Sequence, residues 1–442
     1  MAARPRRPAV SGRPKAAAYD AHPGHVTPAA RKDVSVQQTL PGTRVILHGA
    51  RKCDVDGETD GFWVLFDGDR IAATGQGPGW AAHAADGADV VDAAGAVLTP
   101  GFIDLHSHGG GGFSFDDAAA VPGGAAAAEG ALAVHRAHGT TRSLLSLVAN
   151  PVPALERSLA AIADLAERDP LVLGSHLEGP FLAPSRKGAH NPDFLISPSP
   201  AVVEPLLAAA RGTLRQLTIA PELPGALDAV GALAEAGVVV AVGHTEADEE
   251  QAQAAFERGA RLLTHAFNAM PGIGHRAPGP VVAAIRDERV TAELVLDGVH
   301  VHPDVARLLL EAADGRVALI TDAMAAAGAA DGSYRLGSLR VAVVDGVARL
   351  AGTDGAPDRA AGGAPGAIAG STLTQDRALR LATGQCGMSL RAAVTALTWV
   401  PARVLGTDHW LGRLAPGYAA DAVLLDDAYE VRAAWGAGKR LA

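Results

Sequence analysis

Two histidines, His106 and His108, stand two residues apart at the end of an apolar stretch. Side chains two apart on a β-strand point to the same face, so both imidazoles can bind one metal ion. Glycines 109–112 follow directly and leave space around the pair. Such a pair is equally compatible with the start of a polar loop, so it is a candidate metal site only together with other ligands.

Three further residues of metal-binding type end apolar segments: Glu178, His244 and His265. Each taken alone is more typical of a capping or hydrogen-bonded structural residue. Their recurrence at equivalent segment ends favours a common centre, because a barrel gathers its strand ends around one mouth. Imidazole nitrogen and carboxylate oxygen together suit zinc or iron, and a glutamate can bridge two ions. We therefore predict a divalent metal site with one or two ions per subunit.

Two more polar residues at such ends are candidates for catalysis. Asp322 ends the segment VALITD, and an aspartate beside a metal-activated water can take its proton and later protonate a leaving amine. His300 lies at the end of the turn DGVH, where it can polarise a substrate carbonyl. The alternatives are an ordinary capping aspartate and a surface histidine.

The elements that must position these residues are alternating apolar runs and helical patterns. Apolar runs typical of buried parallel strands cover 102–107, 142–148, 171–177, 214–220, 238–243, 261–265, 291–296 and 317–322. Helical patterns separate most of them, at 126–138, 151–168, 226–237, 246–259 and 302–314. The order predicts an α/β protein with a (β/α)8 TIM-like barrel, whose active site lies at the carboxyl ends of the strands. With one strand fewer, a doubly wound sheet is the alternative.

Both ends of the chain contain short β-rich segments, which predict one small β-sandwich domain built from the two termini. The expected organisation is a flexible N-terminal extension at 1–40, a first part of the β domain at 41–98, the barrel at 99–404 and a second part of the β domain at 405–442. The segment 353–366 is rich in Gly and Ala and is expected to be a mobile surface loop.

Composition narrows the classes of partner. The chain of 442 residues has a net charge of −10, which argues against nucleic acid or an acidic membrane as the main partner. Cys53 and Cys386 are the two cysteines and stand far apart, so no disulfide framework is expected and the predicted location is the cytoplasm. No membrane span and no signal peptide are expected, because long apolar runs are lacking.

Several segments resemble the N-acetylglucosamine-6-phosphate deacetylase branch of the amidohydrolase superfamily. They are PGFIDLHSHGGGG, HLEGPFLAPSRKGAHNP, VGHTEA, THAFNAMPG, DGVHVHP, LITDAMAAAG and IAGSTLT, and they run from Pro100 to Thr374. The resemblance implies hydrolysis of N-acetylglucosamine 6-phosphate to glucosamine 6-phosphate and acetate, in amino-sugar catabolism and cell-wall recycling. It also implies attack by a metal-bound hydroxide, with Asp322 as acid and base and His300 polarising the carbonyl.

The same resemblance implies roles for further residues. Glu178, His244 and His265 match core metal ligands, and His106 with His108 match a second pair that some members have. The predicted substrate-binding residues are Ala189, His190, Asn268, Ala269, Arg276, Asp297, Gly298, Ile368, Ala369 and Gly370. In the family, the arginine that corresponds to Arg276 reaches the substrate of the adjacent subunit, which implies a homodimer. A guanidinium also suits phosphate for its paired hydrogen bonds.

Two alternatives remain. The first is another amidohydrolase, acting on a cyclic amide or an N-acyl amino acid. Many of those enzymes bridge two metals with a carboxylated lysine, whereas the bridge candidate here is Glu178, and Asn268 with Arg276 favours an anionic sugar. The second is a non-catalytic barrel that binds a sugar phosphate. Such a protein is expected to have lost ligands or the acid, and this chain keeps every candidate position.

Overall fold

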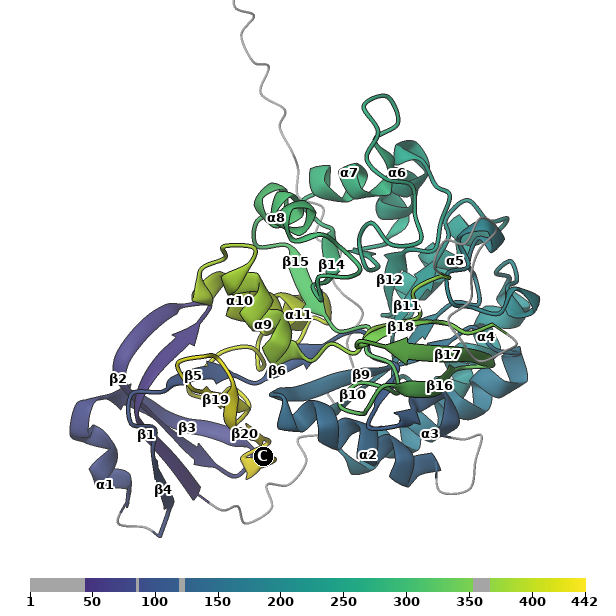
Figure 1. The fold of residues 1–442 in the computed structure, drawn as a ribbon. Helices are drawn as coiled ribbons and strands as arrows, with labels where there is room; N and C mark the ends of the chain where they lie inside the picture. The colour runs from purple at the N-terminus through teal and green to yellow at the C-terminus, as the bar shows by residue number, and fades with distance from the viewer. Residues whose placement is uncertain (1–43, 85–86, 119–123, 353–365) are drawn as a thin grey trace, which may run out of the picture. The chain divides into compact units, whose positions relative to one another are not determined.

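Eight parallel strands form the centre of the protein in the computed structural model, which describes residues 44–84, 87–118, 124–352 and 366–442 (Figure 1). The strands are β6 (Phe102–Asp104), β9 (Thr140–Val148), β10 (Val172–Glu178), β11 (Leu214–Ile219), β12 (Val239–Val242), β13 (Leu262–Leu263), β14 (Thr291–Val295) and β15 (Val317–Ile320). Each pairs with its neighbour in this order, and each lies within or overlaps a predicted strand. The predicted α/β barrel is therefore confirmed.

The barrel closes between its first and last strands by contacts just beyond their ends. The amide of Asp322 donates to the carbonyl of His106 at 2.8 Å, and the amide of His108 donates to the carbonyl of Ala323 at 2.7 Å. A single parallel bridge joins Ser107 to Ala323. The segment with the histidine pair and the segment with the candidate acid are thus hydrogen-bonded side by side.

Helices follow most barrel strands. They are α2 (Gly124–Ala137), α3 (Val152–Arg168), α4 (Pro200–Ala210), α5 (Ala226–Glu235), α6 (Glu249–Arg258), α7 (Gly279–Arg286) and α8 (Pro303–Ala312), with α9 (Gln375–Gly384), α10 (Leu390–Leu397) and α11 (Trp399–Val404) after the last strand. Helix α3 buries Leu155, Leu159 and Ile162, spaced by three and four residues, so one apolar stripe faces the strands. A capping box between Asp248 and Gln251 starts α6.

Both chain ends contribute to one eight-stranded sheet, as the sequence predicts. Its strands are β1 (Arg44–Asp54), β2 (Gly57–Asp67), β3 (Arg70–Gln76), β4 (Asp89–Asp92), β5 (Val97–Pro100), β19 (Ala422–Leu425), β20 (Val431–Gly436) and β21 (Lys439–Arg440), and α1 (Ala81–Ala84) precedes β4. Strand β5 pairs antiparallel with β19. A buried bidentate ion pair, from Arg142 Nε and Nη2 to Asp421 at 2.6 and 3.1 Å, fixes barrel strand β9 to the residue before β19.

A third sheet was not anticipated. It consists of β16 (Gly332–Leu336), β17 (Leu339–Val344) and β18 (Val347–Leu350), and a short hairpin of β7 (Gly109–Gly110) and β8 (Phe113–Ser114) follows the histidine pair. The amide of Leu350 donates to the carbonyl of Ala367, and that of Ala369 donates to Ala348. This sheet therefore holds the segment of Ile368 to Gly370 against the barrel.

The predicted extension at 1–40 and almost all of the predicted loop at 353–366 lie outside the described residues. Among the residues that are described, no helix has the length and apolar character needed to cross a membrane.

Candidate metal centre

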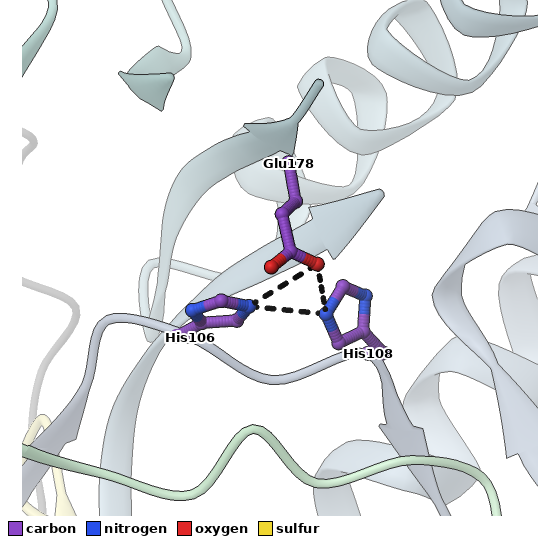
Figure 2. Close-up of side chains that lie close together, drawn as sticks. All are labelled: His106, His108 and Glu178. Atoms are coloured by element: carbon purple, nitrogen blue, oxygen red, sulfur yellow. Dashed lines mark hydrogen bonds and ion pairs between the residues drawn. The ribbon is translucent and has the colours of Figure 1, made fainter. Parts of the chain in front are cut away.

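Glu178 lies between two pairs of histidines. Its Oε1 is 2.9 Å from His244 Nε2 and 2.8 Å from His265 Nε2. Its Oε2 is 3.2 Å from His108 Nε2 and 3.7 Å from His106 Nε2 (Figure 2). The five side chains therefore make two ligand groups that share one carboxylate. The structure brings together every residue that the sequence predicts as a metal ligand.

These ligands come from the carboxyl ends of four barrel strands. Glu178 is the last residue of β10, whereas His244 and His265 each lie two residues beyond the end of a strand with positive φ, of 48° and 25°. This unusual backbone conformation turns both rings towards Glu178. Gly188 lies against His244, where a Cβ atom would be 2.9 Å from the ring, so only glycine leaves room for this imidazole.

One histidine of each pair is held by a partner at its other nitrogen. His244 Nδ1 lies 2.8 Å from the carbonyl of Arg186, and His106 Nδ1 lies 3.3 Å from Glu293 Oε2. Both partners are acceptors, so Nδ1 carries the hydrogen and, in the neutral ring, Nε2 presents a lone pair. For His108 and His265, no partner of Nδ1 is found in the described part of the chain.

This tautomer makes a cation the natural occupant of the centre. The lone pairs of His106 and His244 face a carboxylate oxygen, and each also faces the Nε2 of the other histidine of its pair at 3.1 Å. Lone pairs in this arrangement repel one another unless a positive charge lies among them. Imidazole nitrogens with a shared carboxylate, backed by a carbonyl and a carboxylate, fit zinc or iron.

Protons compete with a metal cation for the histidine nitrogens of this centre. Burial disfavours charged rings, but the nearby carboxylates outweigh it and raise the pKa of His106 and, through Asp322 and Glu178, that of His108 to about 9. Burial likewise opposes a charged Glu178, yet the surrounding histidines hold its pKa well below the usual range. The metal-free centre therefore holds protons that a bound cation displaces.

His190 also contacts Glu178, but in a different chemical state. Its Nδ1 accepts a hydrogen bond from the amide of Ala149 at 3.2 Å, so the hydrogen of the neutral ring is on Nε2, 3.3 Å from Glu178 Oε2. Burial lowers the pKa of His190 to about 4. His190 is thus a neutral hydrogen-bond donor rather than a fifth imidazole ligand. The preceding predicted contact, Ala189, is buried against the third sheet.

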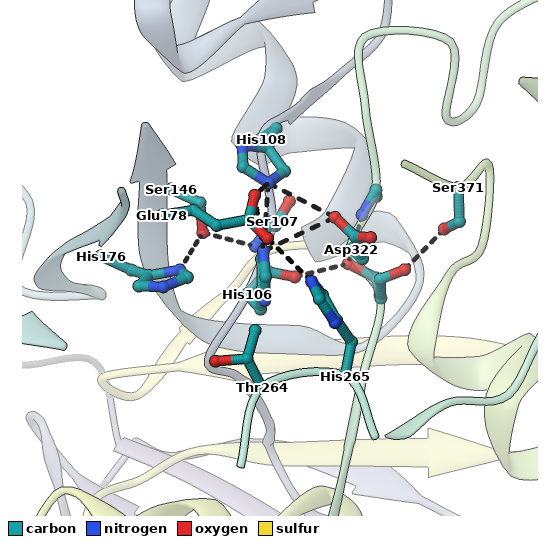
Figure 3. Close-up of polar contacts among 12 residues, drawn as sticks. His106, Ser107, His108, Ser146, His176, Glu178, Thr264, His265, Asp322 and Ser371 are labelled. Atoms are coloured by element: carbon teal, nitrogen blue, oxygen red, sulfur yellow. Dashed lines mark hydrogen bonds and ion pairs between the residues drawn. The ribbon is translucent and has the colours of Figure 1, made fainter. Parts of the chain in front are cut away.

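Asp322 lies beside the first histidine pair (Figure 3). Its Oδ1 is 3.3 Å from His108 Nε2 and 3.6 Å from His106 Nε2. Burial raises its pKa, but His106 and the hydrogen bond with His108 outweigh that effect, so the pKa is lowered. Ser371 holds its backbone, because the amide of Ser371 donates to the carbonyl of Asp322 at 2.7 Å. The carboxylate is placed to exchange protons with a group bound at the first pair.

His300 is oriented by Asp297. His300 Nδ1 donates to Asp297 Oδ2 at 2.7 Å, while Asp297 Oδ1 accepts from the amides of Val299 and His300. Burial lowers the pKa of His300, but this bond to Asp297 outweighs it and raises the pKa. Both Asp297 oxygens are thus engaged within the turn that contains Gly298, and His300 Nε2 has no hydrogen-bond partner among the residues that the structure describes.

The other predicted substrate residues surround this centre to different extents. Gly370 is close to Asp322, since a Cβ atom on it would be 3.0 Å from the Asp322 carbonyl. Asn268 donates its amide to the carbonyls of His265 and Ala266, and the amide of Thr245 donates to the carbonyl of Ala269. Arg276 is exposed, and within the described residues it has no hydrogen bond or ion pair that would bring it to the centre.

Three buried polar residues around His106 are not among the predicted site residues. Glu293 and Gln216 hydrogen-bond to each other, and His176 packs edge-on to the His106 ring with centroids 4.5 Å apart. Each lies within an apolar strand run. A charged or polar residue inside such an apolar run could have indicated, from the sequence alone, that these residues belong to the site.

The chain is similar in sequence to an amidohydrolase family model and to deacetylases of phosphorylated amino sugars. The amidohydrolase family model matches residues 97–440. The chain is 39% identical over 348 residues to N-acetylgalactosamine-6-phosphate deacetylase of Escherichia coli O157:H7, covering 78% of this chain and 87% of the relative. It is 33% identical over 356 residues to N-acetylglucosamine-6-phosphate deacetylase of Lysinibacillus sphaericus, covering 78% of this chain and 85% of the relative.

Solved structures of deacetylases are also similar to this chain. A mutant of N-acetyl-D-glucosamine-6-phosphate deacetylase from Mycobacterium smegmatis, in complex with N-acetyl-D-glucosamine-6-phosphate, superposes with a TM-score of 0.81 and 41% identity, covering 90% of this chain and all of that one. The corresponding enzyme from Thermotoga maritima gives a TM-score of 0.77 and 27% identity, covering 90% and 99%.

Proposed function

This chain belongs to the amidohydrolase family, and from that membership we propose that it hydrolyses N-acetylglucosamine 6-phosphate to glucosamine 6-phosphate and acetate. The observation that carries the proposal is the shared carboxylate of Glu178 between two histidine pairs, with Asp322 Oδ1 3.3 Å from His108 Nε2. Relatives and solved structures named as deacetylases of phosphorylated N-acetyl amino sugars support it.

Asp322 is the proposed acid and base. A divalent cation, zinc or iron, held by Glu178 and the four histidines supplies a Lewis acid that polarises the amide and acidifies water. Asp322 accepts the proton of the attacking water and then delivers it to the nitrogen as the acetyl group leaves. This delivery is essential, because an amide anion is a very poor leaving group.

His300 is the proposed donor to the carbonyl oxygen. Asp297 raises its pKa and fixes Nδ1, which leaves Nε2 to stabilise the negative charge that develops on that oxygen. One such donor typically contributes about 3 kcal/mol to the transition state. Asp297 thereby acts through His300 rather than on the substrate directly.

The sugar is proposed to bind through His190, Asn268 and the segment of Ile368 to Gly370, with Ala269 and Gly298 lining the site. The exposed Arg276 is proposed to bind the phosphate of a substrate held by a second subunit, which makes the enzyme a homodimer. Its free guanidinium supports this assignment, since no group of the described chain occupies it. The proposed setting is amino-sugar catabolism in the cytoplasm.

Acetate release from N-acetylglucosamine 6-phosphate is the direct test. We expect activity that chelation removes and that zinc or iron restores, with little activity on unphosphorylated N-acetylglucosamine. N-acetylgalactosamine 6-phosphate is a second candidate substrate because of the relative at 39% identity, so both epimers are compared by kcat/KM. A metal-loaded protein that releases acetate from neither sugar phosphate contradicts the proposal.

A further inference from the structure

Glu293 is a buried carboxylate underneath the metal centre. It lies in the middle of strand β14 between apolar neighbours and is 0% exposed. Its oxygens accept from Gln216 Nε2 at 2.7 Å, from His106 Nδ1 at 3.3 Å and from the backbone amide of His265 at 3.4 Å. None of these partners is a lysine or arginine. A carboxylate in such surroundings is costly unless a positive charge lies nearby.

The contacts of Glu293 reach both halves of the centre. His106 belongs to the first ligand group and His265 to the second. The bond to His106 fixes the tautomer and the direction of the ring, because an acceptor at Nδ1 leaves Nε2 as the ligand atom. The oxygen of Gln216 has no partner in the described structure, so Glu293 is the group that fixes how this amide points.

Three buried carboxylates surround the centre. Glu178, Asp322 and Glu293 are 4%, 8% and 0% exposed, and within the described residues none of them contacts a lysine or arginine. These carboxylates carry three negative charges, which a bound divalent cation offsets in part.

We infer that Glu293 is the positioning residue for the cation held by His106 and His108: it fixes the tautomer and direction of the His106 ring and places a carboxylate directly behind it. This inference rests on the proposed metal-dependent function, but it concerns how tightly the centre holds the ion at His106 and His108.

Two substitutions separate charge from shape. Glu293→Gln keeps the shape and removes the charge, and Gln216 can turn its unpartnered oxygen towards the new amide, so the fold is expected to persist. Glu293→Asp keeps the charge on a shorter side chain. We expect E293Q to weaken the second binding step by about 10–100-fold, as for other groups that hold metal ligands. E293D is expected to weaken it less.

The measurements are metal content by mass spectrometry and zinc titration against a chromophoric chelator, on the full chain. His106→Asn identifies which binding step belongs to the His106 ion. Asp287→Asn is the matched control: this buried carboxylate precedes the same strand β14 but bonds to Gln253 and Arg289, so both zinc affinities should stay as in the wild type.

An E293Q protein with two ions at unchanged affinity overturns the inference, and so does a greater loss in E293D than in E293Q, since that order indicates a packing role. If E293Q does not fold, Gln216→Met serves instead, because it frees Glu293 without removing it. It should weaken the same step, and an unchanged step overturns the inference. Acetate release is assayed separately: a wild type that binds two ions but is inactive contradicts the proposed function and leaves the role of Glu293 standing.

Discussion

Five histidines surround Glu178, yet hydrogen bonds divide them into different chemical kinds. His106 and His244 are held at Nδ1 by acceptors, whereas His190 accepts at Nδ1 from the amide of Ala149. The first two therefore present lone pairs to a cation, and the third presents a hydrogen. Residue type and spacing alone do not contain this distinction, because it depends on what lies behind each ring.

We propose that the Nε2 hydrogen of His190, which faces Glu178 in this structure, is the one that the substrate accepts, so replacing His190 should weaken substrate binding and leave the metal bound. We expect His190→Asn to keep the wild-type metal content while KM rises by roughly tenfold, the cost of about one hydrogen bond to substrate. The comparison variant is His244→Asn, which removes a ligand and should lose bound metal. Metal analysis of both proteins beside steady-state kinetics decides the matter, and metal loss in the His190 variant would reassign this residue as a ligand.

Replacing Asp322 should spare binding and abolish turnover. Asp322→Asn is nearly the same shape but cannot carry the proton from water to the leaving nitrogen. We expect kcat to fall by about 10²–10⁴-fold, the usual contribution of a general acid or base. Single-turnover acetate release and binding of the intact substrate by calorimetry measure the two effects. A variant that keeps most of its rate would exclude Asp322 as the proton carrier.

Much of this residue-scale arrangement was predictable because the ligands end apolar strands, and strand ends of a barrel meet. His106, Glu178, His244 and Asp322 all follow that rule. Glu293 was not predicted as a site residue, because it lies in the middle of its strand and not at the end. Its contact with His106 depends on how the two strands are placed in the barrel, which the sequence pattern does not give. The contact of Asp297 with substrate stays a prediction, and the structure adds that its oxygens accept from His300 Nδ1 and from the amides of Val299 and His300.

At the scale of elements, the eight strands could be predicted from the sequence, because barrel strands buried on both faces are almost continuously apolar. The closure of the barrel was not, since it runs through the irregular segments around His108 and Ala323. The third sheet, β16 to β18, was missed as well. Its strands are short, and β16 in particular is largely exposed and lacks a clear alternation.

Elements are also joined by ion pairs that depend on pH. Asp376, in the first turn of α9, bonds to His138 after α2 and to Arg380. Burial raises its pKa, but the bond to His138 and other contacts outweigh it and lower the pKa from 3.8 to about 2. A depressed pKa stabilises the folded protein above the unfolded value, so this stabilisation is present above pH 4 and lost as pH falls towards 2.

We therefore expect Asp376→Asn to lower the free energy of unfolding at pH 6 and to have a much smaller effect at pH 2.5. Denaturant unfolding at the two pH values, on chelated protein so that metal loss does not interfere, measures the difference. His138→Gln should reproduce part of the effect at pH 6. An equal effect of Asp376→Asn at both pH values would show that packing, and not charge, is what the substitution removes.

At the scale of the whole molecule, the site is expected to be complete only in a dimer. Mixed dimers test this with two inactive chains, Arg276→Ala and Asp322→Asn. If Arg276 acts on the neighbouring subunit, one site of each mixed dimer has both residues intact. Random mixing then restores about a quarter of the sites. Activity that stays at the level of the separate variants would place Arg276 in its own subunit's site or outside the site altogether.

The pairing of β5 with β19 has a consequence for how the protein is made. These neighbouring strands are separated by more than 300 residues of sequence. Strand β5 must therefore wait, with one edge unpaired, until the residues of β19 have been translated. A polypeptide that ends before β19 leaves that edge exposed to other nascent chains, so truncations that remove Ala422–Leu425 should cause aggregation during synthesis rather than a partly active product.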